Sequence, residues 1–154
     1  MYSYLEIKAK CLQELENRVA SLHQDQNGNS ERGTNIDEGI VPMMFAEGGY
    51  NSRLAVIQDL PKGKVIWHFD RTDMARAKET LGDSACIMGN VPASLLFSGT
   101  PGEVKDYCEK LIDAVGRGGG FILAEGAVID EGKPDNLLAV VQAAKEYGVY
   151  KGTS

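Results

Sequence analysis

Four short apolar runs, each closed by polar residues at the same end, constrain the fold of this chain most strongly. They are VPMMFAEGGYN, VIWHFDRTD, ACIMGNVP and FILAEGAVID, and each is followed by a helix-like or loop segment. Such alternation predicts parallel strands joined by crossovers. We interpret the runs as half of a (β/α) barrel, whose catalytic face lies at the carboxyl ends of its strands. Five polar residues are expected at those ends: Glu47, His68, Asp70, Asn90 and Glu125.

The composition is that of an ordinary globular domain, with 154 residues, 43% hydrophobic and 25% charged. A formal charge of -6 argues against binding to nucleic acid or anionic lipid, because both need clustered Lys and Arg. No apolar stretch is long enough to span a bilayer and the N-terminus has no signal-peptide pattern, so we expect a cytoplasmic protein. Cys11, Cys86 and Cys108 lack close spacing and predict buried free thiols.

The composition changes once along the chain, near residue 40. Residues 1–23 are expected to form an amphipathic helix, because four apolar residues recur at steps of three and four: Leu12, Leu15, Val19 and Leu22. Residues 24–36 are polar and contain glycine, which predicts a linker or loop. Residues 37–154 hold the alternating segments and are expected to be the folded domain.

The best-signalled helix follows the third apolar run. Thr100, Pro101 and Glu103 predict a capping box with proline at the first helical position. Its core face is expected to comprise Val104, Tyr107, Cys108, Leu111, Ile112 and Val115.

Two further helices have weaker signals. Thr72 is expected to precede a short helix as its cap, and Gly82 is expected to end that helix. Pro134 is expected to begin the last helix, whose core face we assign to Leu137, Leu138, Val141 and Ala144. The glycine run GRGGGF precedes a strand, so it predicts a helix stop and turn rather than a phosphate-binding loop.

Side chains of the segment VIWHFD alternate between the two faces of a strand. Trp67 and Phe69 suit a layer covered by helices, which directs His68 and Asp70 into the barrel. A histidine beside a carboxylate is a candidate catalytic acid/base pair. The alternative for His68 is a residue that forms a hydrogen bond inside the barrel and only positions its neighbours.

Glu47 and Glu125 are the other two candidate catalytic residues. Each ends a strand and precedes a glycine, where a ligand or another backbone can come close. Two carboxylates facing one cavity are costly unless they are solvated, protonated or paired with a cation, and that cost favours function. Either glutamate could instead form an ion pair with Arg53 or Arg71 at the rim.

Three residues are candidates for substrate binding: Asn90, Asp73 and Arg53. Asn90 either contacts a substrate or forms a turn before Val-Pro. Asp73 lies at the start of the expected short helix, where the helix dipole favours an acid without any function.

From about Ile36 to Tyr150 the chain resembles the C-terminal half of the uroporphyrinogen decarboxylase family, which also contains zinc-dependent corrinoid methyltransferases. The stretch FDRTDMARAKETLGDSACIMGNVPASLLFSGTPGEV looks like the family's sixth strand, helix and seventh strand. GGGFILAEGAVIDEGKPDNLLAVVQAAKEYG looks like its eighth strand and last helix, and VPMMFAEGGY sits where the fifth strand would be. The resemblance implies a partial (β/α)8 TIM barrel made of the last four units, and a carboxy-lyase-like protein that acts on a tetrapyrrole.

The chain departs from the family's patterns at its site positions. The zinc ligands of the corrinoid methyltransferases correspond to Phe45, Glu47 and Ala127, none of which supplies a thiolate, and we expect no metal or cofactor. The eighth-strand histidine of the decarboxylases corresponds to Glu125. The alternative function is the methyltransferase component of a corrinoid-dependent demethylase system, with a methyl donor as substrate and a corrinoid protein as partner.

Half a barrel leaves two parallel strand edges and an inner face to be closed. A second copy of the chain could close it, or a partner could supply the first four strands. We expect a truncated barrel that associates through its exposed edges. A non-catalytic fragment or subunit and an open sheet with helices on both faces are the remaining alternatives.

Overall fold

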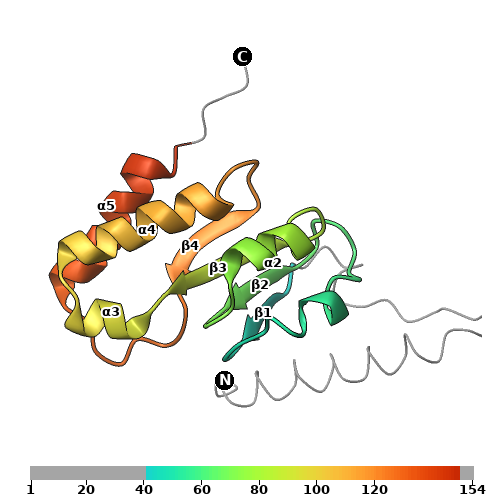
Figure 1. Ribbon diagram of the computed structural model, residues 1–154, viewed down its shortest axis with the longest axis horizontal. Helices are drawn as coiled ribbons and strands as arrows, with labels where there is room; N and C mark the ends of the chain where they lie inside the picture. Colours follow the sequence, from blue (N-terminus) through green and yellow to red (C-terminus); the bar gives the residue numbers. More distant parts are fainter. Residues whose placement is uncertain (1–40, 150–154) are drawn as a thin grey trace, which may run out of the picture. The chain divides into compact units, whose positions relative to one another are not determined.

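The computed structural model describes residues 41–149, which hold one sheet of four parallel strands (Figure 1). The strands are β1 (Met43–Ala46), β2 (Ile66–Phe69), β3 (Cys86–Val91) and β4 (Phe121–Glu125), and they lie side by side in that order. All three strand pairs are parallel. The four strands predicted from the apolar runs are therefore confirmed. The helix expected over residues 1–23 and the linker expected over 24–36 lie outside the described residues.

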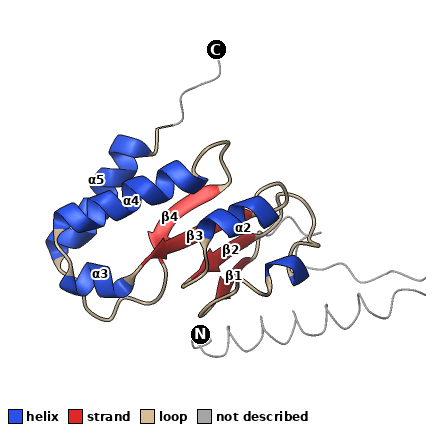
Figure 2. Ribbon diagram, viewed as in Figure 1, coloured by secondary structure: helices blue, strands red, loops and turns tan. Residues whose placement is uncertain are grey.

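Helical segments alternate with the strands, as Figure 2 shows. They are the 3-10 turn η1 (Leu54–Val56) and the helices α2 (Met74–Leu81), α3 (Ala93–Ser98), α4 (Pro101–Val115) and α5 (Pro134–Tyr147). Right-handed crossovers between strands that follow each other in order place every connecting helix on the same face of the sheet. This is the α/β arrangement of a partial (β/α) barrel, and it excludes the open sheet with helices on both faces.

Strand β2 shows why one face of the sheet carries the core. Val65, Trp67 and Phe69 are almost fully buried on the helix-covered face, whereas Ile66 and His68 are half-buried on the other face. The rings of Trp67 and Phe69 stack with centroids 6.2 Å apart. The predicted alternation is confirmed, and it directs His68 away from the helices.

Helix α4 begins as its sequence predicts. The Thr100 hydroxyl accepts a hydrogen bond from the Glu103 N–H at 3.3 Å, and the Glu103 carboxylate accepts one from the Thr100 N–H at 2.8 Å. Val104, Cys108, Leu111 and Val115 are buried, and Tyr107 and Ile112 are half-buried. Cys108 is a free thiol in the core, where burial raises its pKa to about 11.

The capping box predicts a measurable titration. The Thr100 N–H and hydroxyl both donate to the Glu103 carboxylate and hold its pKa below the usual 4.5. Replacing Thr100 with valine removes the hydroxyl donor and keeps the N–H, so the pKa of Glu103 is expected to rise partway toward its usual value. Side-chain NMR titration of both proteins checks this. An unchanged pKa in Thr100→Val would contradict the role of the hydroxyl.

Because a depressed carboxyl pKa stabilises the fold only above the unfolded-state value, this contribution is lost as the pH falls through the folded-state pKa. The difference in stability between the wild type and Thr100→Val is therefore expected to shrink in acid.

Helix α2 begins one residue later than predicted. Asp73 is its N-cap, and its carboxylate accepts hydrogen bonds from the N–H groups of Ala75 and Arg76 at 3.0 and 3.2 Å. The expected cap, Thr72, is buried, and its hydroxyl accepts a hydrogen bond from the Tyr50 N–H instead. Gly82 ends the helix as expected.

The predicted core face of α5 is wrong. The buried residues are Asn136, Ala139 and Ala143, which pack against α3 and α4, whereas Leu138 and Val141 are 55% and 49% exposed. Ala144 and Leu137 are also exposed, the latter by 38%. Small residues form the contact because they let the two helix backbones come close. The larger apolar side chains face away from the core of the described residues.

The GRGGGF segment is the predicted stop and turn. Gly116 ends α4, and Gly118, Gly119 and Gly120 all have positive φ before β4 begins. The Lys78 ammonium on α2 donates to the Gly119 carbonyl and ties this turn to the neighbouring helix.

Candidate functional site

The carboxyl ends of β1 and β2 continue into two loops that are linked by hydrogen bonds between residues 22 positions apart. The Gly48 N–H donates to the Asp70 carboxylate at 3.0 Å, and the Tyr50 N–H donates to the Thr72 hydroxyl at 3.0 Å. The Asp73 N–H donates to the Asn51 side chain at 2.9 Å. We call this set the rim ladder. It orders the predicted catalytic edge of the sheet.

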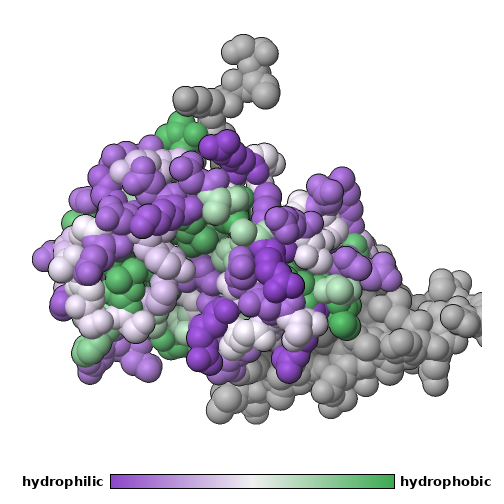
Figure 3. Space-filling view, viewed as in Figure 1, coloured by the Kyte–Doolittle hydropathy of each residue, from purple (hydrophilic) through white to green (hydrophobic). Residues whose placement is uncertain are grey.

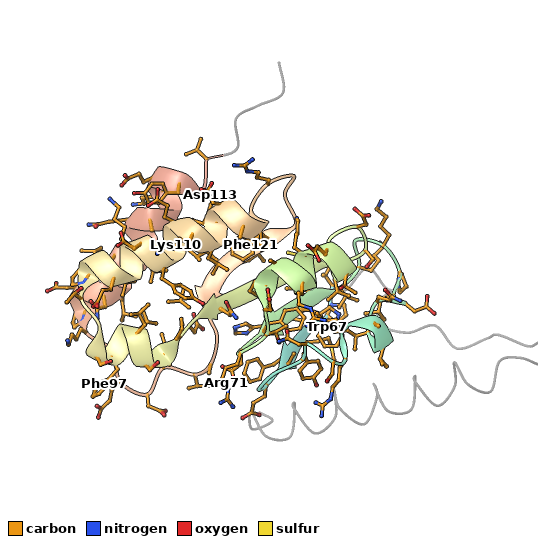
Figure 4. All side chains as sticks on the ribbon, viewed as in Figure 1. Trp67, Arg71, Phe97, Lys110, Asp113 and Phe121 are labelled. Carbon is orange, nitrogen blue, oxygen red and sulfur yellow. The ribbon has the colours of Figure 1, made fainter. Side chains whose placement is uncertain are left out.

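Asp70 lies at the start of the rim ladder, where its carboxylate orients the guanidinium of Arg71. Its carboxylate lies 3.4 Å from the Arg71 Nε, and the Arg71 side chain is 80% exposed while that of Asp70 is 18% exposed. Figure 4 shows Arg71 at this rim, well apart from Asp113 on α4. The arrangement presents a guanidinium to solvent beside the strand ends, where it can bind a carboxylate.

His68 forms its hydrogen bond across the inner side of the sheet. Its Nε2 lies 2.6 Å from the main-chain carbonyl of Glu125, and its ring contacts that of Phe45 with centroids 5.1 Å apart. A carbonyl only accepts, so Nε2 carries a proton and donates it. This bond joins the end of β4 to β2 across β3, which is the positioning role that the sequence left open for His68. Asp70 has other partners, Gly48 and Arg71.

Glu47 and Glu125 lie at the two edges of the sheet. Glu47 follows β1 and Glu125 ends β4, so two strands separate them and their backbones are about 14 Å apart at the usual strand spacing. Glu125 also follows Leu123 by two residues, and Leu123 packs on the helix-side core. Alternation therefore directs the Glu125 side chain toward the face opposite His68. The described part of one chain does not bring the two carboxylates into a common cavity.

The glycine after Glu125 shows what approaches this strand end. A side chain at Gly126 would place its Cβ 2.8 Å from the main-chain oxygen of Asp70. Two reasons were predicted for a glycine after Glu125, the approach of a ligand and the approach of another backbone. The structure shows the second.

Asn90 belongs to the scaffold beneath the rim. It lies within β3, 8% exposed, and its amide donates to the Thr72 carbonyl at 2.7 Å. The Tyr107 hydroxyl donates to the Asn90 main-chain and side-chain oxygens at 3.3 and 3.4 Å. Of the two alternatives for Asn90, the turn is excluded, because the residue lies within a strand. The sequence predicted Tyr107 as a core residue of its helix. Helical spacing indicates which face is buried, but it does not indicate a hydrogen bond such as this one.

The other two substrate-binding candidates have structural contacts. Arg53 lies over the Tyr50 ring, with its guanidinium carbon 5.2 Å from the centroid. Asp73 caps α2, as described above. Arg53 remains exposed at the β1 end of the rim.

Within residues 41–149, no group of three or more His, Cys, Asp or Glu side chains is arranged to hold a metal ion. No helix in that part of the chain is long and apolar enough to cross a membrane. A hollow of 490 Å³ lies where α3 ends and α5 begins, between Phe97 and Pro134. Its lining includes none of the site residues predicted from the sequence.

Comparison with known proteins identifies the family of this chain. The family model for uroporphyrinogen decarboxylase matches residues 3–147. The chain belongs to the uroporphyrinogen decarboxylase family. The match begins well before Ile36, so it includes the N-terminal segment that the resemblance noted above left out.

Curated relatives carry the same name at low identity. The uroporphyrinogen decarboxylase of Chlorobaculum parvum is 32% identical over 113 residues, which are 69% of this chain and 31% of the relative. That of Chlorobium phaeobacteroides is 32% identical over 82 residues, 50% of this chain and 23% of the relative. That of Coxiella burnetii is 27% identical over 79 residues, 51% of this chain and 22% of the relative. The chain thus matches less than a third of the length of these relatives. No solved structure matches it.

Proposed function

We propose that this chain forms one wall of a uroporphyrinogen decarboxylase-type active site and takes part in removing carboxylate groups from a tetrapyrrole. The observation that carries the proposal is the family match over residues 3–147, together with a parallel sheet whose polar residues gather at the carboxyl ends of its strands. Active sites of (β/α) barrels lie at that end. Since the matched segments span under a third of the curated relatives, this wall requires the rest of a barrel to enclose a substrate.

Decarboxylation sets definite demands on such a site. The ring first takes up a proton, the bond between the carboxylate carbon and its neighbour breaks, CO2 leaves, and the electron pair neutralises the protonated ring. The neighbouring carbon then takes up a second proton and the ring gives up the first. The site must therefore hold carboxylates and deliver a proton. A tetrapyrrole with several carboxylates needs cations around the mouth.

Arg71 and His68 meet these two demands in the proposal. Arg71 is exposed at the rim and held by Asp70, so its guanidinium can bind a substrate carboxylate. His68 lies on the inner face of β2, and its Nε2–H already donates to the Glu125 carbonyl. In the charged imidazolium, the Nδ1–H is the second donor and supplies the proton.

Methyl transfer to a corrinoid protein finds no comparable support. Phe45 and Ala127, which correspond to zinc ligands of the methyltransferases, carry no side-chain donor atoms for a metal.

Substituting His68 with glutamine separates proton transfer from positioning. A glutamine amide can still donate to the Glu125 carbonyl, but it does not transfer a proton at neutral pH. With uroporphyrinogen as substrate under reducing, anaerobic conditions, we expect the wild type, assembled with the rest of a barrel, to yield products with fewer carboxylates. His68→Gln is expected to be about 100-fold slower. Chromatography of the oxidised porphyrins measures both rates.

The matched control is Asp113→Asn, an exposed acid on α4 whose contact with Arg117 spans 3.9 Å. It is expected to leave the rate unchanged, because exposed ion pairs contribute little. A wild-type rate in His68→Gln would leave His68 a positioning residue. No product from the wild type would overturn the proposed function.

A further inference from the structure

The segment that follows β2 is held by hydrogen bonds from both of its neighbours. On the β1 side, the Arg71 N–H donates to the Gly48 carbonyl at 3.1 Å, and the rim ladder adds its three bonds. On the β3 side, the Asn90 amide donates to the Thr72 carbonyl at 2.7 Å. Strand β2 lies between β1 and β3, so these bonds fix the main chain before and after the Arg71 side chain.

The bond between Asn90 and Thr72 is buried at both ends. Asn90 is 8% exposed and Thr72 is 3% exposed. A buried carbonyl that has no donor is costly, so the main chain at Thr72 is expected to keep the position in which the Asn90 amide reaches it. Asn90 itself has little surface for a ligand, and its amide acts on the segment that carries Arg71.

The Tyr107 hydroxyl on α4 sets the orientation of the Asn90 amide. It donates to the main-chain and side-chain oxygens of Asn90 at 3.3 and 3.4 Å. Because the Asn90 Oδ1 accepts there, the Nδ2 is turned toward the Thr72 carbonyl. Burial raises the pKa of Tyr107 above its usual 10.0, so the hydroxyl keeps its proton at neutral pH. Both distances are long for a hydroxyl donor, and this contact is therefore weaker than the 2.7 Å bond.

Helix α4 is thereby connected to the rim. Figure 3 shows that the side of the molecule formed by α2 and α4 is largely hydrophilic, with a few apolar patches. Tyr107 is half-buried on α4, and Asn90 and Thr72 are buried. We call these three residues the α4–rim link. The link ends next to Arg71, whose side chain is 80% exposed.

We propose that Asn90 is a positioning residue for substrate binding, which acts through Thr72 to hold the Arg71 guanidinium at the rim for a substrate carboxylate. Tyr107 holds Asn90 in turn. The inference rests on the proposed function in taking a substrate carboxylate as the group that Arg71 binds. A long side chain loses rotamer freedom when it binds, and a main chain fixed in advance reduces that loss.

A positioning role of this kind has its own kinetic signature. Loosening Arg71 weakens the binding of the substrate and of the transition state equally, so KM rises and kcat stays the same. A general loss of folded protein does the opposite, because it lowers the apparent kcat and leaves KM unchanged. The two parameters therefore separate positioning from mere stability.

The decarboxylation assay with uroporphyrinogen, on the chain assembled with the rest of a barrel, measures both parameters. Asn90→Ala is expected to raise KM about 10-fold and to change kcat less than about twofold. Tyr107→Phe removes only the weaker contact and is expected to raise KM about threefold. If Asn90→Ala does not fold, Tyr107→Phe decides the point.

Val115→Ala is the matched control on the same helix. Val115 is buried at the end of α4, about 12 Å along the helix from Tyr107. Its truncation weakens the core without removing a hydrogen bond of the α4–rim link. We expect the KM of Val115→Ala to equal that of the wild type.

NMR of the 154-residue chain tests the positioning without any activity. The Arg71 Nε–H signal is identified by its absence in Arg71→Lys. In Asn90→Ala, its heteronuclear NOE is expected to fall, and hydrogen exchange of the Tyr50 N–H is expected to accelerate about 10-fold. Tyr107→Phe is expected to show smaller changes of the same sign, and Val115→Ala none.

The combined results separate this inference from the proposed function. A folded Asn90→Ala with the KM of the wild type would overturn the inference and leave the proposed function standing. A raised KM with an unchanged Arg71 signal would also contradict it, because Asn90 would then contact the substrate directly. An equal rise of KM in Val115→Ala would reduce the effect to general loosening. If the wild type yields no product, the proposed function fails, whereas a more mobile Arg71 in Asn90→Ala would still support the positioning role.

Discussion

Replacing Gly89 with alanine is expected to lower the free energy of unfolding by about 3 kcal/mol or more. Gly89 lies in the middle of β3 with a φ of +123°, a conformation that residues with a side chain rarely adopt. A Cβ at this position would overlap the carbonyl oxygen of Phe69, the last residue of β2. Backbone strain and backbone overlap therefore act together, and neither can be relieved by rotating a side chain.

A glycine in an open position provides the matched control. Gly102 lies in the first turn of α4, and a Cβ there would meet no atom within 4 Å. Gly102→Ala is expected to raise stability by up to about 1 kcal/mol, because alanine favours the helix and reduces the freedom of the unfolded chain. Urea unfolding followed by circular dichroism measures both. Equal stability of Gly89→Ala and the wild type would show that β2 and β3 can separate at this point without cost.

Much of the fold follows from local patterns in the sequence. The alternating burial of Trp67, His68 and Phe69 could be predicted from the two faces of a single strand. The capping box of Thr100 and Glu103 could be predicted from two residues that are three positions apart. Such features are predictable because their causes lie within one element of the chain.

The errors arise where the cause lies in another element. Leu138 and Val141 looked like the core face of α5 because they are large and apolar, but the close approach of α4 selects Ala139 and Ala143. That choice depends on the distance between two helix axes, which side-chain hydrophobicity alone does not encode.

The candidate site shows the same division. Its placement at the strand ends could be predicted, since parallel strands bring their carboxyl ends to one edge. The partner of His68 could not, because it is a main-chain carbonyl and every residue has one. The separation of Glu47 from Glu125 could have been predicted, because strands that lie in sequential order put the first and the last strand at opposite edges of the sheet.

A second large loss of folding stability is expected from a substitution at the junction between α3 and α5. The last carbonyl groups of a helix have no partner within the helix and need a donor from elsewhere. At the end of α3, the Asn136 amide donates to the carbonyls of Leu96 and Gly99, each at 3.0 Å, with a third contact to Leu95 at 3.5 Å. Asn136 is fully buried in the first turn of α5. One side chain thus joins the end of one helix to the start of another.

Asn136→Ala is expected to lower the free energy of unfolding by about 1–3 kcal/mol, because the carbonyls of Leu96 and Gly99 each lose one of two donors. Lys133 supplies the other donor to each, its N–H to Leu96 and its ammonium to Gly99. Among residues 41–149 the Asn136 Oδ1 has no hydrogen-bond partner, so removing it offsets a part of the loss. Asn136→Asp is expected to cost more, since it replaces the donating group with an oxygen among carbonyl oxygens. Gln142→Ala, which removes an exposed amide from the same helix, is the control and is expected to change stability by less than about 0.5 kcal/mol. Urea unfolding of all three variants decides the point. If Asn136→Ala were as stable as Gln142→Ala, the donors of Lys133 would be enough to satisfy the end of α3, and the Asn136 amide would contribute nothing to the junction.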